Sequence, residues 1–398
     1  MNQGVRVIGL VPGTGYGDGA ADLAYALDQG AVPVVWTPII DGGMERLSLD
    51  AALRNIPLHR QHDMRRLWQS DQTCDRFLLS VPPPDWHTPW RNALPDLSPF
   101  CYTAWEVDHV PDTWIQALAP FRRVFVPSYF NRNTLMAAGI KPEITVIPHM
   151  ARPAQPGALT PDLGQIRSDD FLFYSIGAWS TRKALAKTLR AFLDTFDAAD
   201  PVALAIKTEF EDRTVYEPMR AAKQAEVPAH LVSTAWSVAR ILGEYPNPAR
   251  VHLINTMLTP AEIEGLHQRG DCFLSLAHAE GWGMGAFDAA VRDTPVIITG
   301  WGGQLDYLGE DYPLLVDFDL RATSDYINDG YFYCASHVHW AEADSAHAGE
   351  LMRLALSARS SCKNSAIELG QTLRTRFAAD GIADTLAGAM GLASNSQA

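Results

Sequence analysis

The segment Ala279-Glu280-Gly281-Trp282-Gly283-Met284-Gly285-Ala286-Phe287-Asp288 indicates the fold of this chain more clearly than any other stretch. It follows an apolar run, 272–277, that is typical of a buried strand. The glycines predict a loop between this strand and a helix, and free backbone N–H groups at such a helix start attract phosphate. Glu280 and Asp288 repel phosphate, so they are better suited to accept hydrogen bonds from hydroxyl groups. The segment therefore predicts a diphosphate that carries sugars, a sugar nucleotide, as the ligand.

A purely structural interpretation of the same segment stays open. Glu280 could cap the loop and Asp288 could be a solvated helix residue, because glycine-rich turns from strand to helix are common in α/β folds. The sequence around the segment favours the first interpretation.

The composition describes a soluble globular protein without the charge pattern of nucleic-acid binding. The 398 residues suggest about two domains, and 47% of them are hydrophobic. Acidic residues, 46 against 32 basic ones, give a net charge of −14, which argues against a nucleic-acid partner. The cysteines form no CxxC pair, which favours reduced thiols in a cytoplasm and no zinc site. No stretch approaches roughly 18 apolar residues, so we expect no signal peptide and no transmembrane helix.

Short apolar strands alternate with amphipathic helices along the whole chain, which is the pattern of parallel α/β domains. A Pro- and Gly-rich linker, Ala151–Gln165, separates two series, and Thr259-Pro260-Ala261-Glu262 predicts a clean helix start. We expect two doubly wound domains. The predicted strands are Val5–Val11, Ala31–Trp36, Arg76–Val81, Phe100–Trp105, Arg122–Pro127, Ile144–Pro148, Phe171–Ile176, Ala203–Ile206, Val251–Ile254, Cys272–Ala277 and Pro295–Thr299.

The segment Gly177-Ala178-Trp179-Ser180-Thr181-Arg182-Lys183 follows the first strand of the second series. We expect Arg182 and Lys183 to open a helix, where cations face an unfavourable dipole. Two cations are useful there if they neutralise a departing diphosphate, since this stabilises charge that develops in the transition state. Two solvated surface charges are the alternative.

Two loops of the first series are weaker candidates. The turn Gly13–Gly17 lacks the third glycine of a dinucleotide fingerprint, and Trp36-Thr37-Pro38 offers no acid for a ribose, which argues against NAD. The turn still lets backbone approach a phosphate or a sugar. In the segment Trp105–His109, Glu106, Asp108 or His109 could receive a proton from an acceptor or could simply cap the next helix.

Taken in order, these motifs resemble the nucleotide-sugar-dependent glycosyltransferases of family 4, a retaining group with the GT-B fold. The resemblance covers nearly the whole chain and implies two facing Rossmann-like domains with an interdomain cleft. Residues 1–160 would form the acceptor side and residues 161–398 the donor domain, with the terminal helices packing back on the first. The matching segments are Gly15–Gly17, Tyr102–Glu106, Val126–Asn131, Val146–His149, Gly177–Lys183, Glu280–Asp288 and Pro295–Ile297.

The resemblance also implies a role for each motif. Glu280 would lie at the donor sugar, Asp288 would bind the nucleotide ribose, and Arg182 and Lys183 would hold the diphosphate, with Glu106 on the acceptor side. The family mechanism attacks the anomeric carbon on the face from which the diphosphate leaves, so it implies no protein nucleophile, no metal and no cofactor. The implied donor-binding residues are Gly15, Tyr16, Gly17, Gly281, Trp282, Gly283, Met284, Gly285 and Asp288.

Four positions depart from the family pattern. Asp288 stands where the family usually has Glu and reaches one methylene less far. Ala178 lies where many members carry a cation, and Trp105-Glu106 lies where many have a histidine. Gly285 replaces a common proline.

We therefore expect transfer of a hexose to a growing polysaccharide or a lipid-linked glycan, in the cytoplasm of a bacterium. A related GT-B epimerase or hydrolase, or a non-catalytic sugar-nucleotide-binding protein, are the alternatives. The segment Arg54–Trp68, with Arg60, Arg65 and Arg66, could touch the inner membrane face through its basic residues, although a solvated helix face is the simpler interpretation.

Overall fold

The computed structural model describes residues 4–40, 48–83, 87–215, 232–326 and 335–392. The chain forms two compact units, which are treated separately below. Unit 1 contains residues 1–106, 110–155 and 373–398, and unit 2 contains residues 107–109 and 156–372.

The sheet of unit 1 has six parallel strands in the order β2-β1-β3-β4-β5-β6. Successive strands are added on one side of β1 and then on the other, so β1 and β3 flank the point where strand order reverses. Ligands of doubly wound sheets bind at such points, beyond the carboxyl ends of the strands. The strands are β1 Val5–Leu10, β2 Val34–Ile39, β3 Arg76–Ser80, β4 Ser98–Tyr102, β5 Arg123–Val126 and β6 Glu143–Val146.

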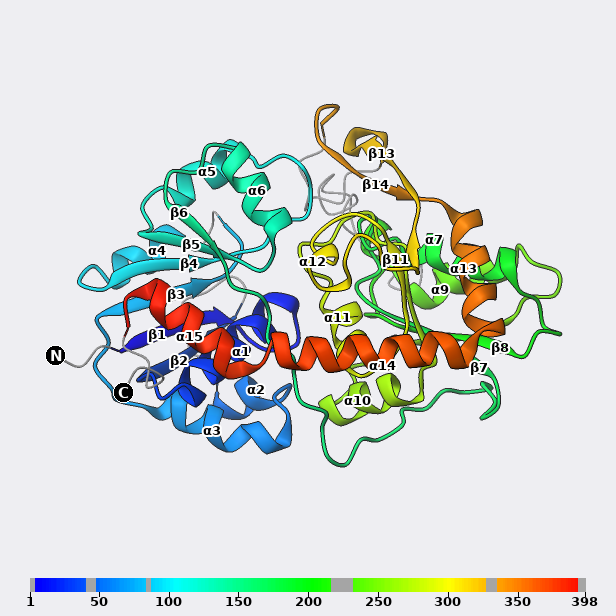
Figure 1. The fold of residues 1–398 in the computed structure, drawn as a ribbon, viewed down its shortest axis with the longest axis horizontal. Helices are drawn as coiled ribbons and strands as arrows, with labels where there is room; N and C mark the ends of the chain where they lie inside the picture. The colour runs from blue at the N-terminus through cyan, green and yellow to red at the C-terminus, as the bar shows by residue number, and fades with distance from the viewer. Residues whose placement is uncertain (1–3, 41–47, 84–86, 216–231, 327–334, 393–398) are drawn as a thin grey trace. The chain divides into compact units, whose positions relative to one another are not determined.

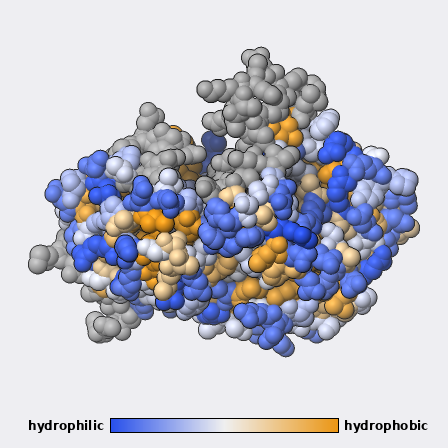
Figure 2. Space-filling view, turned by 90° about the horizontal axis from the view of Figure 1, so that it is seen from above, coloured by the Kyte–Doolittle hydropathy of each residue, from blue (hydrophilic) through white to orange (hydrophobic). Residues whose placement is uncertain are grey.

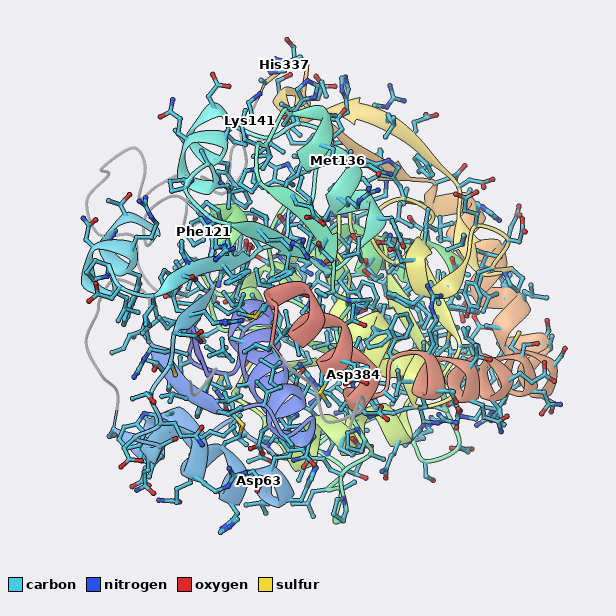
Figure 3. The ribbon with its side chains drawn as sticks, turned by 60° about the vertical axis from the view of Figure 1, so that its left-hand side comes forward. Asp63, Phe121, Met136, Lys141, His337 and Asp384 are labelled. Atoms are coloured by element: carbon cyan, nitrogen blue, oxygen red, sulfur yellow. The ribbon has the colours of Figure 1, made fainter. Side chains whose placement is uncertain are left out.

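Helix α1 begins at the reversal point of this sheet. The side chain of its N-cap residue, Thr14, accepts a hydrogen bond from the backbone N–H of Gly17. The last helix, α15, packs along α1 within the same unit (Figures 1 and 3). The helices are α1 Gly15–Gln29, α2 Leu49–Leu53, α3 Leu58–Gln69, α4 His87–Ala93, α5 Asp112–Leu118, α6 Tyr129–Ala137 and α15 Ala379–Met390.

The sheet of unit 2 also has six parallel strands, in the order β12-β11-β10-β7-β8-β9, so that two strands lie beyond its first strand β7 where unit 1 has one beyond β1. Its strand order reverses between β7 and β10. The strands are β7 Phe171–Ile176, β8 Val202–Lys207, β9 Arg250–Ile254, β10 Cys272–Ser275, β11 Val296–Thr299 and β12 Leu315–Val316.

An aromatic core joins helix α7 to one face of this sheet. Phe173 of β7 lies 5.9 Å from the ring of Phe192 and 5.8 Å from that of Phe196. Helix α14 begins in unit 2 and ends in unit 1. The helices are α7 Leu185–Thr195, α9 Thr234–Leu242, α10 Pro260–Arg269, α11 Met284–Val291, α12 Leu305–Leu308, α13 Ser345–Ser357 and α14 Arg359–Arg376, with a 3-10 turn η2 at Thr323–Asp325.

An antiparallel pair of strands follows the second sheet. Strand β13, Phe318–Ala322, pairs with β14, His339–Ala343, and β14 leads into α13 (Figure 1). The predicted strands contain neither of them, because β13 is mostly exposed and has no continuous apolar run.

The structure confirms the predicted fold class, an α/β chain with two parallel doubly wound sheets. Every predicted strand is present, with ends that differ by a few residues. The capping box at Thr259 and Glu262 is also confirmed, because each side chain bonds the backbone of the other residue.

Arg60 fits neither interpretation of the segment Arg54–Trp68, a solvated helix face or a contact with a membrane. Arg60 is 2% exposed, and its Nη1 lies 2.8 Å from Oδ1 of the buried Asp22. The sequence could not show this partner, which lies on another helix. Arg66 remains half exposed and pairs with Asp28 at 2.7 Å.

Hydrophilic residues predominate on the face shown in Figure 2, with small apolar groups between them. No helix in the described part of the chain is long and apolar enough to cross a membrane.

Candidate functional site

A pocket opens in unit 2 where the strand order reverses. It lies at the carboxyl ends of β7 and β10 and at the start of α11. Lys183 comes to it from the turn before α7, and Glu280 comes from the loop between β10 and α11. The pocket is lined by Ser175, Gly177, Lys183, Glu280, Gly283 and Gly285, among others.

The carboxylate of Glu280 lies between two cations. Its Oε1 is 2.5 Å from Nζ of Lys183, and its Oε2 is 3.5 Å from Nη1 of Arg182. The same Nη1 donates to the carbonyl oxygen of Ala279 at 2.8 Å. The structure thus brings together three of the predicted catalytic residues, although they lie almost 100 positions apart in sequence.

This pairing controls the charge of Glu280. Burial to 7% exposure raises the pKa of a carboxyl group, but the charges of Lys183 and Arg182 outweigh it and hold the pKa of Glu280 below its ordinary value. Glu280 is therefore an anion at neutral pH, and it supplies the counter-charge of both cations.

The backbone of Glu280 is held from the opposite side by the loop after β11. Its carbonyl oxygen accepts a hydrogen bond from the N–H of Gly303 at 2.8 Å. Gly302 has φ +118°, and a Cβ atom there would lie 2.7 Å from the same oxygen. Gln304 donates to the carbonyl oxygens of Thr299 and Trp301, at 2.7 and 2.6 Å, and so holds the loop.

The prediction that Arg182 and Lys183 open a helix is wrong. Helix α7 begins at Leu185, and its N-cap residue Ala184 has a left-handed backbone with φ 48°. This conformation interrupts the helix and leaves both cations in the preceding turn. The turn directs them toward Glu280, and they do not oppose the dipole as residues of the first helical turn would.

The glycine-rich loop brings α11 close to the sheet. Gly283, the N-cap residue, has φ 82°, and Met284 is the first helical residue. A Cβ at Gly285 would lie 3.2 Å from the ring of Phe273 and 3.4 Å from the carbonyl oxygen of Ile176. The glycine thus allows a close approach of α11 to β7 and β10.

Trp282 lies beneath the loop that contains Gly281. It is 3% exposed, and its ring lies 5.1 Å from that of Phe287 and 5.0 Å from that of Tyr307. The hydroxyl of Tyr307 donates to the carbonyl oxygen of Gly283 at 3.3 Å. These buried rings support the backbone that forms the floor of the pocket.

Asp288 is not a solvated helix residue. It is 9% exposed, and its Oδ1 lies 3.4 Å from Nη1 of Arg292, one turn further along α11. Arg292 is bound in turn to the buried Glu264 of α10 at 2.8 Å. The shorter acid therefore belongs to a buried chain of alternating charges.

The corresponding turn of unit 1 is held by hydrogen bonds of Tyr16 and of Asp18, whose Oδ1 accepts from the N–H of Gly13 at 2.7 Å. The hydroxyl of Tyr16 donates to the carbonyl oxygen of Ala104 at 2.9 Å and accepts from the Ala104 N–H at 3.1 Å. A Cβ at Gly17 would lie 2.0 Å from the carbonyl oxygen of Val11, so only glycine fits there. Gly15 is the first residue of α1.

Glu106 follows a tightly held backbone. The side chain of the buried Asn131 bonds both the N–H and the carbonyl oxygen of Trp105, at 2.9 and 2.7 Å. Burial raises the pKa of Tyr16, and the negative charge of Glu106 raises it further. Glu106 thus lies close enough to Tyr16 to affect its pKa.

Asp108 is engaged in a structural contact. Its Oδ1 accepts from the backbone N–H of His339 at 2.7 Å, and its Oδ2 lies 3.0 Å from Nδ1 of the same residue. This double contact joins Asp108 to the start of β14. His109 is more exposed and lies 3.4 Å from Asp108.

Two residues of the site have no place in the sequence-based prediction: His278 and Tyr307. His278 offers a signal, since it stands two residues before Glu280. Tyr307 acts through a backbone contact that a sequence does not show. Among the described residues, no group of three or more His, Cys, Asp or Glu side chains is placed to hold a metal ion.

No family model and no curated protein matches this sequence. Solved structures do match it over the full length. The chain is similar to sucrose-phosphate synthase from Thermosynechococcus elongatus, with a TM-score of 0.64, 12% identity and 98% of each chain covered. The chain has the GT-B fold.

Two further structures agree with this assignment. An α,α-trehalose-phosphate synthase (UDP-forming) from Burkholderia vietnamiensis has a TM-score of 0.63 and 12% identity, with 98% of each chain covered. A mutant of TarM from S. aureus has a TM-score of 0.52 and 9% identity, over 78% of this chain and 54% of that one. The chain thus spans about half the length of TarM.

Proposed function

We propose that the chain is a retaining glycosyltransferase of the family 4 type. It moves a hexose from a nucleotide-diphosphate sugar to a glycan or a lipid-linked saccharide. The observation that carries this proposal is the cluster of Lys183, Arg182 and Glu280 in a pocket at the reversal point of the second GT-B sheet.

The two cations suit a leaving diphosphate. Lys183 and the N–H groups at the start of α11 offer positive charge at the pocket, and Arg182 precedes Lys183 in the same turn. As the bond between the anomeric carbon and the diphosphate breaks, negative charge collects on the phosphate oxygens. Fixed cations stabilise that charge without reorganisation, which lowers the barrier.

Under this proposal, Glu280 binds the two cations when no donor is present and the donor sugar when the donor is bound. Without donor it neutralises Lys183 and Arg182. When a diphosphate takes over those cations, the carboxylate becomes available to accept hydrogen bonds from hydroxyl groups of the donor sugar. The backbone of Gly281–Gly283 follows directly and would lie along the same sugar, and Asp288 would bind the ribose.

The reaction would proceed on one face of the sugar. The acceptor hydroxyl attacks the anomeric carbon on the side from which the diphosphate departs, and its proton passes to the departing phosphate oxygen. The configuration at that carbon is retained without a protein nucleophile. We assign Glu106 to the acceptor side and propose that it assists in orienting the acceptor hydroxyl.

The same proposal covers the location of the two substrates, the cellular compartment and the need for a metal. We place the donor in residues 161–398 and the acceptor in residues 1–160, with polysaccharide synthesis in a bacterial cytoplasm, and we expect no metal or cofactor requirement. Excess EDTA should leave the rate of turnover unchanged. Any contact with the inner membrane face would rely on exposed residues such as Arg66, since Arg60 is buried.

A thermal-shift screen tests the proposal. The similar structures include a UDP-forming synthase and one bound with UDP-2-fluoro glucose, so UDP and its sugars are tested first, followed by GDP, ADP, TDP and their sugars. A concentration-dependent rise in Tm with one nucleotide supports the proposal and identifies the base. If no nucleotide stabilises the folded protein, the proposal is wrong.

A further inference from the structure

His278 connects the Glu280 loop to two neighbouring segments. Its backbone N–H donates to the carbonyl oxygen of Arg182 at 2.8 Å, and its carbonyl oxygen accepts from the N–H of Ala341 at 3.0 Å. Because Arg182 also donates to Ala279, the cationic turn and the Glu280 loop are joined by two hydrogen bonds. Strand β14 supports the same loop from its other side.

The side chain of His278 repeats this connection to β14. Its Nδ1 lies 2.9 Å from the carbonyl oxygen of Ala341 and 3.2 Å from Oε2 of Glu342. A carbonyl oxygen can only accept, so Nδ1 carries the proton. The imidazole is thus held in one orientation by an acceptor on the neighbouring strand.

Aromatic rings enclose the imidazole. Trp340 is stacked on it with 4.7 Å between ring centroids and 13° between planes, and Tyr326 lies 4.9 Å away. His278 is 4% exposed. Tyr326 also lies 4.8 Å from Trp340, so the three rings form one cluster. A side chain that is packed in such a cluster and bonded at its edge has little freedom to move, and so restrains its backbone.

The charges around His278 are balanced. Glu342 forms an ion pair with Lys187 and accepts a hydrogen bond from Tyr326. Burial lowers the pKa of His278, and Glu342 only partly opposes this effect. The imidazole is therefore neutral at physiological pH, and it adds no third positive charge near Arg182 and Lys183.

We propose that His278 is a positioning residue for Glu280. Through its bonds to β14 and Arg182 it fixes the backbone from which the Glu280 carboxylate reaches the two cations and, in the reaction, the donor sugar. The expected loss of kcat rests on the proposed function. The expected effect on the backbone of the Glu280 loop rests on the observed contacts alone. It also gives a role to the β13–β14 hairpin, which lies outside both parallel sheets.

Two substitutions distinguish the effect of the hydrogen bond from Nδ1 from the effect of the volume of the side chain. His278→Asn places an amide N–H near the position of Nδ1, whereas His278→Gln places it near Nε2. The matched control is His347→Asn. His347 lies in the first turn of α13, where its Nδ1 accepts from the N–H of Asp317, and it is outside the site. For each variant we measure kcat, donor KM, nucleoside diphosphate affinity by calorimetry, and Tm.

A positioning role predicts a specific kinetic result. His278→Gln should lower kcat about tenfold, since a small misplacement of a group that contacts the transition state is costly, and should leave nucleoside diphosphate affinity within about threefold. His278→Asn should recover most of kcat. If the Asn and Gln variants lose kcat equally, in proportion to their loss of Tm, His278 is only a structural residue and the proposal is overturned.

Hydrogen exchange of the 277–283 backbone without any ligand separates this proposal from the proposed function. Exchange should be faster in His278→Gln than in His278→Asn or His347→Asn. Glu342→Gln, which leaves the imidazole in place, should show a smaller increase and gives a second test if the Gln variant does not fold. Unchanged exchange overturns the positioning role, whereas a wild-type protein that binds no nucleotide overturns the proposed function alone.

Discussion

In each sheet the strand order reverses next to the first strand, β1 in unit 1 and β7 in unit 2, but the residues at the two reversal points differ in chemistry. In unit 1, the turn at Tyr16 is held by neutral hydrogen bonds to the backbone of Ala104. In unit 2, the corresponding place contains Glu280 between Lys183 and Arg182. A doubly wound sheet thus provides a ligand-binding position in each unit. In unit 2 this position has two cations and an acid, which suit a diphosphate and its sugar.

The largest effect is expected when a cation is removed from unit 2. Lys183→Ala should lower kcat/KM by about 100- to 1000-fold, which is typical for the loss of one fixed group that stabilises developing charge. Steady-state kinetics with the donor that the thermal-shift screen identifies checks this. Lys363→Ala, a surface lysine that contacts the backbone of Asp293, is the control and should retain full activity. A loss below threefold for Lys183→Ala would remove the cations from the mechanism.

Glu280→Gln should separate catalysis from nucleotide binding. We expect at least a tenfold lower kcat, because the amide is a weaker acceptor for sugar hydroxyls. Affinity for the nucleoside diphosphate should be kept or should increase, since Lys183 and Arg182 lose the anion that competes for them. Calorimetry against wild type measures this, with the exposed Glu310→Gln as the control. An equal loss of turnover and nucleotide affinity would place Glu280 at the nucleotide.

The ion pairs of Glu280 with Lys183 and Arg182 predict that the stability of the protein depends on pH. The folded state lowers the pKa of Glu280 below the ordinary 4.5, so its contribution is present above that value and is lost as pH falls through the folded pKa. The difference in unfolding free energy between wild type and Glu280→Gln should therefore be constant above about pH 5 and shrink below the ordinary pKa. Urea unfolding at several pH values measures it. A difference that grows on acidification would contradict the ion pair.

The sequence predicts both sheets but only part of the site, for physical reasons. Buried parallel strands are continuous apolar runs, so strands such as β7 are visible without a structure. The glycine loop and its acids are equally visible. The left-handed backbone of Ala184 is not visible in the sequence, because alanine carries no signal for it. The sequence therefore predicts that the helix starts at Arg182 and Lys183, whereas α7 begins at Leu185. The partner of Arg60 lies on a different helix, and such contacts depend on the tertiary fold.

Asp288→Glu tests whether the residues around Asp288 leave room for a longer acidic side chain. Asp288 is buried against Arg292, which is itself held by Glu264. An extra methylene in such a place costs about 1–3 kcal/mol through overpacking. We expect a lower Tm and no gain in donor affinity. Asp311→Glu, at an exposed aspartate, is the control. Improved donor binding by Asp288→Glu would show that the pocket has room for the longer acid.

The smallest effect should come from the turn at Tyr16 in unit 1. Tyr16→Phe removes a hydroxyl that bonds both the N–H and the carbonyl oxygen of Ala104, and a buried polar group left without its partner costs about 1–3 kcal/mol. The cost should appear as a lower unfolding free energy in urea, with nucleoside diphosphate affinity unchanged, because no charge near Lys183 is altered. Tyr129→Phe, at an exposed tyrosine of α6, should be neutral in both measurements. If Tyr16→Phe instead weakened nucleotide binding as strongly as Lys183→Ala, the two reversal points would share the ligand, and the contrast between a structural turn and a charged one would no longer hold.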